Sequence, residues 1–201
     1  MNRAEKRRQR KLAEKAAKNV KPVQSASPIP GQQTLAIQEF IDLAVQHHNE
    51  GRLPEAESIY QQILQADPNQ PVALHLLGVI AHQVGKNDIA VDLITKALAI
   101  KPDFAEAHYN LGNALRDLGK LDEAVASYHK ALTIKPDYAD AHSNLAIALN
   151  SCGRQSEALD HFKIHLDIER GDNPIDPQHQ SFRFITKAKM NHDIEQFRYL
   201  A

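Results

Sequence analysis

The 201-residue sequence has no tryptophan, a single cysteine, and only 5% aromatic residues. A core built on large rings is therefore not expected, whereas helices can stack on one another through Ala, Leu and Ile. Cys152 has no second cysteine with which to form an internal disulfide, which fits a reducing compartment. The composition favours packed helices over an aromatic-rich globular core.

Long apolar runs are also missing. No stretch of the sequence approaches the roughly 20 apolar residues that a membrane-spanning helix needs. No apolar run of signal-peptide length follows the basic N-terminus. We therefore expect a cytoplasmic protein.

Recognisable catalytic motifs are missing as well. The sequence contains neither the GxSxG pattern of a serine nucleophile nor the GxxxxGK[ST] pattern of a phosphate-binding loop. Two of its eleven histidines, His161 and His165, are spaced i, i+4, which can chelate zinc from one helix face. No third ligand and no HExxH glutamate accompany them, so a packing or solvated role is preferred. We expect no enzyme activity, no metal site and no cofactor.

The net charge of −1 conceals an uneven distribution. Residues 1–21 carry nine basic and two acidic side chains, a charge of +7, so the remainder of the chain carries −8. Residues 22–33 are rich in Pro and Ser and form a predicted linker. The basic arm is either a solubilising, disordered tail or a contact for nucleic acid or an anionic membrane surface. The second possibility involves Arg3, Lys6, Arg7, Arg8, Arg10 and Lys11.

The middle of the chain repeats with a period of 34 residues. Glycine recurs at this interval, and so do one alanine and one proline in each period. A period between 20 and 50 residues indicates stacked supersecondary units rather than one globular core. The recurring residues are Gly51, Gly85, Gly119 and Gly153; Ala56, Ala90, Ala124 and Ala158; and Pro68, Pro102 and Pro136.

Each period contains two apolar stripes with helical spacing. In the third period a glycine, Gly119, lies between them, where helices commonly end in a left-handed residue. We expect Asp122 to cap the second helix and Pro136 to end it. Gly78 and Gly112 occupy one first-helix position, where a missing side chain would let Ile94 and Tyr128 of the second helix approach closely.

This pattern resembles the tetratricopeptide repeat of bacterial proteins. The residues that carry the resemblance in the third period are Leu111, Gly112, Ala124, Tyr128, Ala131 and Pro136. The resemblance implies an all-α fold, an α-α superhelix of four helix–turn–helix repeats at residues 37–70, 71–104, 105–138 and 139–170. Residues 1–33 would form a disordered or frayed basic arm with its linker. Residues 171–201 would form a loop and a helix that either caps the last repeat or connects to a further domain.

The resemblance also implies a concave groove lined by the first helix of each repeat. Asn110 and Asn144 lie 34 residues apart and would form an exposed asparagine ladder, similar to that of the O-GlcNAc transferase repeats, which holds extended polypeptide. The alternative is that these asparagines are merely tolerated at the surface. The predicted groove residues are His75, His82, Gln83, Tyr109, Asn110, Asn113, Arg116, Asp117, Ser143, Asn144 and Asn150.

Two functions follow from the resemblance. The first is a protein–protein interaction scaffold that binds a partner polypeptide in the groove. The second is a substrate-recruiting or regulatory module of a larger or separately encoded enzyme, such as a glycosyltransferase, sulfotransferase or oxygenase. A homodimer through the ends of the stack is a further expectation.

Overall fold

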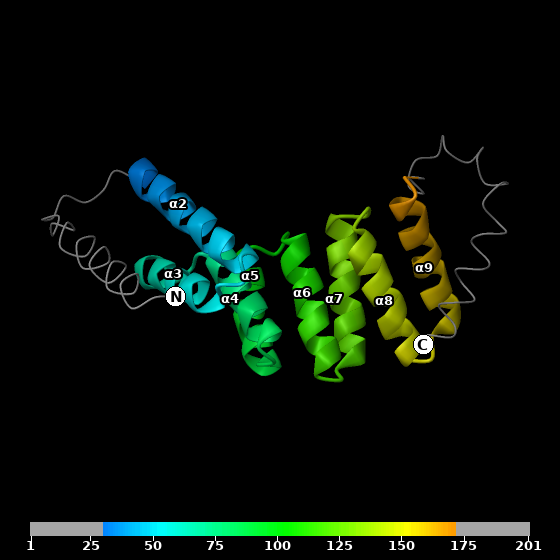
Figure 1. Cartoon of the computed structure of the whole chain (residues 1–201). Coiled ribbons are helices and arrows are strands. Elements are labelled where there is room, and N and C mark those ends of the chain that lie inside the picture. The colour runs from blue at the N-terminus through cyan, green and yellow to red at the C-terminus, as the bar shows by residue number, and fades with distance from the viewer. Residues whose placement is uncertain (1–29, 172–201) are drawn as a thin grey trace, which may run out of the picture. The chain divides into compact units, whose positions relative to one another are not determined.

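The computed structural model describes residues 30–171, with side chains from residue 37 onwards, and within this range it contains eight α-helices and no strand. Contacts divide the chain into Met1–Ile37 and Gln38–Ala201, and the description below concerns the second unit. The helices, labelled as in Figure 1, are α2 (Pro30–Asn49), α3 (Leu53–Ala66), α4 (Pro71–Gln83), α5 (Asn87–Ile100), α6 (Ala105–Asp117), α7 (Leu121–Ile134), α8 (Ala139–Ser151) and α9 (Gln155–Glu169).

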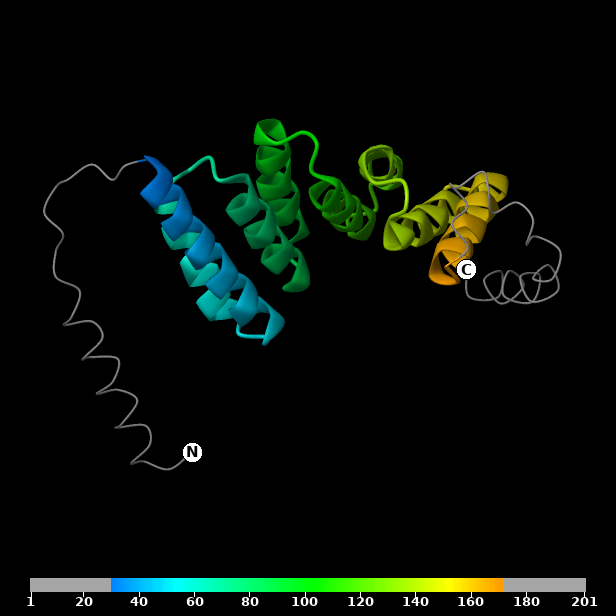
Figure 2. The ribbon, with the colours of Figure 1, turned by 90° about the horizontal axis from the view of Figure 1, so that it is seen from above.

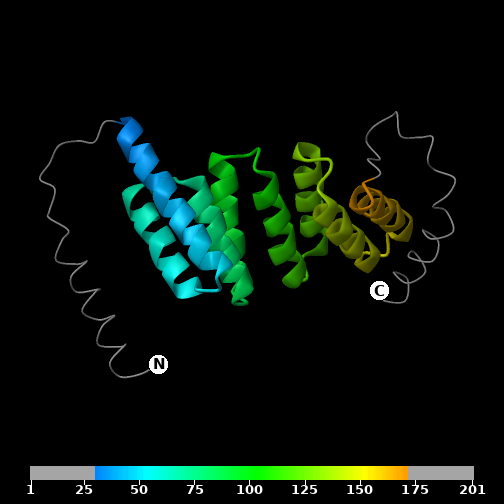
Figure 3. The same cartoon turned by 45° about the horizontal axis from the view of Figure 1, so that its top comes forward.

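The helices pack in sequential pairs. Helix α4 packs against α5, α6 against α7 and α8 against α9, and each pair joins the next through α5–α6 and α7–α8 contacts. The turned views in Figures 2 and 3 show this same succession along the stack. The first helices of neighbouring pairs also contact one another, α4 with α6 and α6 with α8. The predicted all-α stack of helix–turn–helix repeats is therefore confirmed.

A glycine in the left-handed conformation ends each first helix. Gly119 has a φ of 75°, and Gly51, Gly85 and Gly153 have nearly the same value. The amide of Gly119 donates to the carbonyl of Arg116 at 2.8 Å, and that of Lys120 donates to Leu115 at 2.9 Å. These two bonds form a Schellman motif, which satisfies carbonyls that the end of the helix would otherwise leave unpaired. The predicted role of Gly119 is confirmed.

The predicted cap at Asp122 is wrong. Helix α7 begins at Leu121, and Lys120 occupies the cap position without a side-chain hydrogen bond. Asp122 lies one residue further on, in the first turn. There its carboxylate faces the positive end of the helix dipole, which stabilises the helix without a capping bond.

Glycines inside the first helices allow the two helices of a pair to touch. A Cβ atom on Gly112 would lie 2.5 Å from Cε1 of Tyr128, and one on Gly78 would lie 2.6 Å from Cγ1 of Ile94. Both large side chains are fully buried. The predicted close approach is confirmed, and it sets the distance between α4 and α5 and between α6 and α7.

Two predicted segments lie outside the described residues, namely the basic arm with most of its linker and the C-terminal capping or connector helix. Their predicted roles stay predictions. Between residues 30 and 171, none of the helices combines the length and apolar character that a bilayer crossing demands.

Candidate binding surface on the first helices

The predicted groove residues lie on three neighbouring first helices. Helix α4 carries three of them, α6 five and α8 three, as the helix bounds show. Helix α4 contacts α6 and α6 contacts α8, so the three helices that carry these residues are neighbours in the stack.

One row of hydrogen bonds joins the C-terminal halves of successive first helices. Nε2 of His48 on α2 donates to Oε1 of Gln83 on α4 at 3.0 Å. Nε2 of His82 on α4 donates to Oδ2 of Asp117 on α6 at 2.8 Å. Both pairs are separated by 35 residues, one more than the repeat period. The row therefore links the first repeat to the second and the second to the third, through side chains that lie one position away from repeat equivalence.

A second row runs through the N-terminal halves of α4, α6 and α8. Nδ2 of Asn110 donates to Nε2 of His75 at 2.9 Å. Nδ2 of Asn144 donates to the hydroxyl of Tyr109 at 3.0 Å. Both pairs are again 35 residues apart. The expectation of freely exposed asparagines is wrong, since Asn110 and Asn144 are half-buried and each bonds to the preceding repeat.

Two predicted groove residues belong to the packing between helices. His75 is 4% exposed and meets the ring of Phe104 edge-on, with ring centroids 4.7 Å apart. Asn113 is 9% exposed, and its Oδ1 accepts hydrogen bonds from Tyr128 at 2.8 Å and from Asn144 at 2.9 Å. These two side chains pack between helices and hold the surface residues in place, but they are not themselves exposed.

The charges on this surface are held in fixed positions. Asp117 accepts from Nε of Arg116 at 3.2 Å and from Nη2 at 3.1 Å, in addition to its bond from His82. Burial works against the charged carboxylate, but the bonds from His82 and Arg116 hold the pKa of Asp117 below its ordinary value. Burial lowers the pKa of His75 to about 4, although the charge of Glu106 opposes that shift. At neutral pH His75 is uncharged, and the surface presents an Arg116–Asp117 pair.

Helix α8 carries predicted surface residues whose side chains make no internal hydrogen bond. Within the described part of the chain, the side chains of Ser143 and Asn150 have no hydrogen-bonding partner and are half-buried. Ile147, between them on α8, is 40% exposed. Helix α8 therefore has both polar groups and an apolar side chain that are accessible to solvent.

His48 is a surface residue that sequence reasoning missed. It occupies the same repeat position as His82, 34 residues earlier. The repeat register could have identified it, had the register been extended back to the first repeat.

The histidines considered for zinc have other partners. Nδ1 of His165 donates to the carbonyl of Ala139 at 3.1 Å, and His161 is hydrogen-bonded to His142. Among the described residues, no group of three or more His, Cys, Asp or Glu side chains is placed to hold a metal ion.

Comparison with protein families gives three overlapping matches. Models described as TPR or tetratricopeptide repeats match residues 47–108, 93–126 and 112–153. Together these matches cover residues 47–153, and this part of the chain consists of tetratricopeptide repeats. A comparison with curated proteins gives no match.

Solved structures resemble this tetratricopeptide-repeat chain over most of its described length. A structure of MamA from AMB-1 is 29% identical, with a TM-score of 0.59, and the match covers 67% of this chain and 80% of that one. MamA 41-end from Desulfovibrio magneticus RS-1 is 20% identical, with a TM-score of 0.61, over 68% of this chain and 77% of that one, and it shows the fold alone. The repeats and these neighbours support a protein–protein interaction scaffold. The finer resemblance to the repeats of O-GlcNAc transferase stays a prediction.

Proposed function

We propose that this chain is a scaffold that binds an extended segment of a partner polypeptide across the first helices α4, α6 and α8. The observation that supports this most directly is the pair of hydrogen-bonded rows that join successive first helices. They hold His82, Asp117, Asn110 and Asn144 in set conformations before any partner arrives. Such preorganisation reduces the entropy lost on binding.

The surface has the chemistry to pair with a peptide backbone. Each internal bond uses the NH2 group of the Asn110 or Asn144 amide, and the Oδ1 carbonyl of that amide remains able to accept a hydrogen bond from a partner. Every residue of a partner except proline has a backbone N–H, so contacts to these carbonyls tolerate many partner sequences. Solenoids use extended surfaces of this kind to hold other chains.

A matched pair of substitutions tests the location of the site. Ile147 on α8 is 40% exposed, and Ile134 at the end of α7 is 39% exposed. Ile147→Arg and Ile134→Arg therefore make the same chemical change at similar exposure, one on a first helix and one on a second helix. Neither residue takes part in the hydrogen-bonded rows, so neither change is expected to alter the fold.

The experiment has two stages. The full chain is used to capture partners from its native cells, and the partner identified by mass spectrometry is then titrated against the wild type and both variants by calorimetry. We expect Ile147→Arg to weaken binding at least tenfold and Ile134→Arg to leave it unchanged. Equal affinities for Ile147→Arg and the wild type, with both variants folded by circular dichroism, would refute binding at α8.

A further inference from the structure

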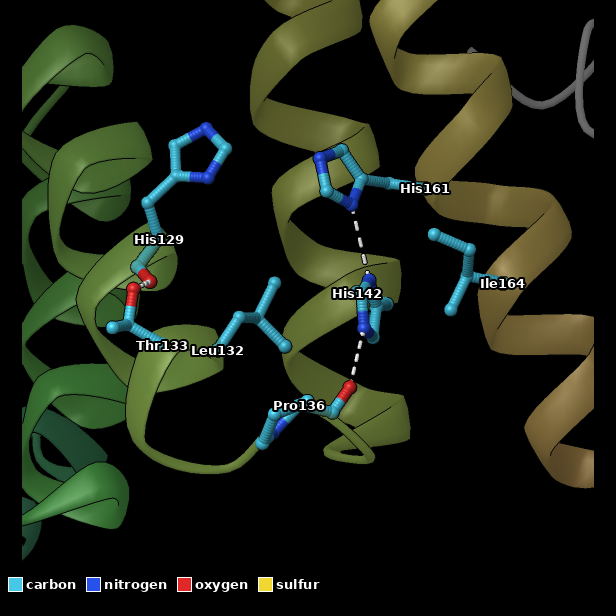
Figure 4. A pocket seen from close by; sticks show the side chains of 7 residues that line it. All are labelled: His129, Leu132, Thr133, Pro136, His142, His161 and Ile164. Carbon is cyan, nitrogen blue, oxygen red and sulfur yellow. Dashed lines mark hydrogen bonds between the residues drawn. The ribbon is translucent and has the colours of Figure 1, made fainter. Parts of the chain in front are cut away.

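Three histidines from three different helices meet at the junction of the third and fourth repeats. His129 lies on α7, His142 on α8 and His161 on α9. They line a pocket of about 320 Å³ together with Leu132, Thr133, Pro136 and Ile164, shown in Figure 4. The second helices α7 and α9 supply two of the three rings, so this cluster is separate from the proposed partner surface on the first helices.

Hydrogen bonding fixes the protonation of two of these rings. The carbonyl of Pro136 can only accept, so Nε2 of His142 must carry the proton of the 2.9 Å bond between them. In the neutral ring this leaves a lone pair on Nδ1 of His142, which accepts from Nδ1 of His161 at 3.0 Å. The chain of bonds from Pro136 to His161, drawn in Figure 4, is complete when both imidazoles are neutral.

Added protons disturb this arrangement in two ways. When both rings are protonated, the N–H groups on Nδ1 of His142 and Nδ1 of His161 face each other across 3.0 Å and their bond breaks. A proton on the second nitrogen of His161 would place a charge beside His129, whose ring centroid lies 5.6 Å away, and beside His142, at 5.2 Å. Because the rings come from α7, α8 and α9, the resulting repulsion acts between helices.

We propose that His129, His142 and His161 form a proton-sensitive joint that holds α8 and α9 against α7 while the imidazoles are neutral and loosens when they are protonated. The joint is a property of the fold and does not depend on the proposed function. Any effect of the joint on partner binding rests on the proposed function, since α8 carries Ser143, Asn144 and Asn150 of the proposed surface.

The electrostatic surroundings agree with this geometry. Burial, reinforced by the neighbouring imidazoles of His142 and His129, lowers the pKa of His161 to about 4. Burial also lowers the pKa of His142 and of His129. The other titratable or charged groups that act on the three rings are Glu157 and Asp160, which oppose the shifts, and Arg154 and His165, which reinforce them.

The direction of the effect on stability follows from these shifts. In the unfolded chain a histidine titrates near pH 6.5. Below that pH the unfolded chain therefore binds more protons than the folded one. The contribution of the cluster is fully present above about pH 6.5 and is lost as the pH falls towards about 4.

The third repeat supplies an internal comparison. Nε2 of His108 donates to the carbonyl of Pro102 at 2.9 Å, as His142 does to Pro136 one repeat later. At the position equivalent to His161 the third repeat has Ser127, whose hydroxyl bonds back to the carbonyl of Glu123 at 2.9 Å. The third repeat thus has the same histidine–carbonyl bond without a histidine pair.

Thermal unfolding of the full chain at pH 7.5 and pH 5.0 tests the joint. The variants are His161→Ser, which introduces the residue of the third repeat, and the control His108→Gln, which removes an imidazole outside the cluster. We expect the fall in melting temperature between the two pH values to be smaller in His161→Ser than in the wild type by about 3 °C or more. His108→Gln should retain the fall seen in the wild type. Equal falls in His161→Ser and the wild type would overturn the proposal.

Nuclear magnetic resonance provides a second readout that needs no variant to fold. The Cε1–H signals of the wild-type histidines are followed between pH 8 and pH 4. We expect midpoints below 6.5 for His142 and His161, with the amide signals of α8 and α9 broadening or shifting over the same interval. Midpoints at or above 6.5 for both residues, or titration without any change in α8 and α9, would contradict the joint.

Discussion

The hydroxyl of Tyr128 donates a 2.8 Å hydrogen bond to Oδ1 of Asn113, inside the contact between α6 and α7. Tyr60 occupies the same repeat position two repeats earlier and, like Tyr128, is 0% exposed. The Tyr60 hydroxyl is nevertheless buried without a partner. The reason is that Val45 stands where the third repeat has Asn113. Two equivalent tyrosines therefore have opposite hydrogen-bonding states.

This contrast predicts opposite outcomes for the same substitution. Tyr128→Phe should lower the free energy of unfolding by about 1–3 kcal/mol, because it removes a buried hydrogen bond and deprives Asn113 of a partner. Tyr60→Phe should be neutral or stabilising, because it removes a buried hydroxyl that bonds to nothing. Urea denaturation followed by circular dichroism measures both changes. A loss of similar size in the two variants would contradict this account.

Supplying the missing acceptor should stabilise the first repeat. Val45→Asn places an amide where Asn113 stands in the third repeat, within reach of the Tyr60 hydroxyl by the symmetry of the repeats. A double-mutant cycle with Tyr60→Phe separates the new bond from other effects of the substitution. We expect a favourable coupling energy of about 1 kcal/mol. A coupling indistinguishable from zero would show that the asparagine does not reach the hydroxyl.

Gly112 is predicted to be less replaceable than Gly78. A Cβ atom on Gly112 would lie within 3 Å of three atoms of the rigid Tyr128 ring, whereas one on Gly78 would meet mainly Cγ1 of Ile94. An aliphatic side chain can change rotamer more readily than a buried ring can move. Gly112→Ala should therefore destabilise the chain by about 1–3 kcal/mol, and Gly78→Ala by less. Thermal melts of both variants at one pH decide the order, and the reverse order would contradict the packing argument.

Asn144 is predicted to matter for stability, in contrast to its neighbour Asn150. Asn144→Ala removes the bonds to Tyr109 and Asn113, both from the preceding repeat, and should cost about 1 kcal/mol. Asn150 lies on the same helix, and its side chain has no hydrogen-bonding partner among the described residues, so Asn150→Ala should change little. Urea midpoints of the two variants provide the comparison. If Asn144→Ala unfolds at the wild-type midpoint, the inter-repeat bonds contribute nothing measurable.

The 34-residue period predicted much of the fold and less of the surface. It identified Gly119 as a left-handed helix end and Gly112 as a point of close approach, because glycine also occurs one period earlier at both positions, as Gly85 and Gly78. It did not predict the bond between His75 and Asn110. A period shows which residues are equivalent, whereas contacts between repeats depend on how far neighbouring helices are displaced along their axes. That displacement makes partners of residues 35 apart.

The pairing of His142 with His161 escaped prediction for a related reason. His161 drew attention only through its spacing from His165 on one helix. Its actual partner lies on a different helix, and no equivalent pair occurs in the third repeat, where Ser127 takes the place of His161. A contact that occurs in only one repeat does not recur with the 34-residue period, so the period cannot predict it.

The loss of stability caused by substitutions at Gly119 is predicted to depend on backbone conformation rather than on steric crowding. Its φ of 75° disfavours side chains other than glycine, although a Cβ atom there would have no neighbour within 4 Å. Gly119→Val should therefore cost about 1–2 kcal/mol, because a branched side chain resists the left-handed region. Gly119→Asn should cost less, because asparagine adopts this conformation more readily. Both variants add side-chain volume in open space, so a steric effect would not distinguish them in this way. Thermal unfolding of the two variants beside the wild type measures the difference, and equal losses would show that the left-handed turn does not set the stability of this helix end.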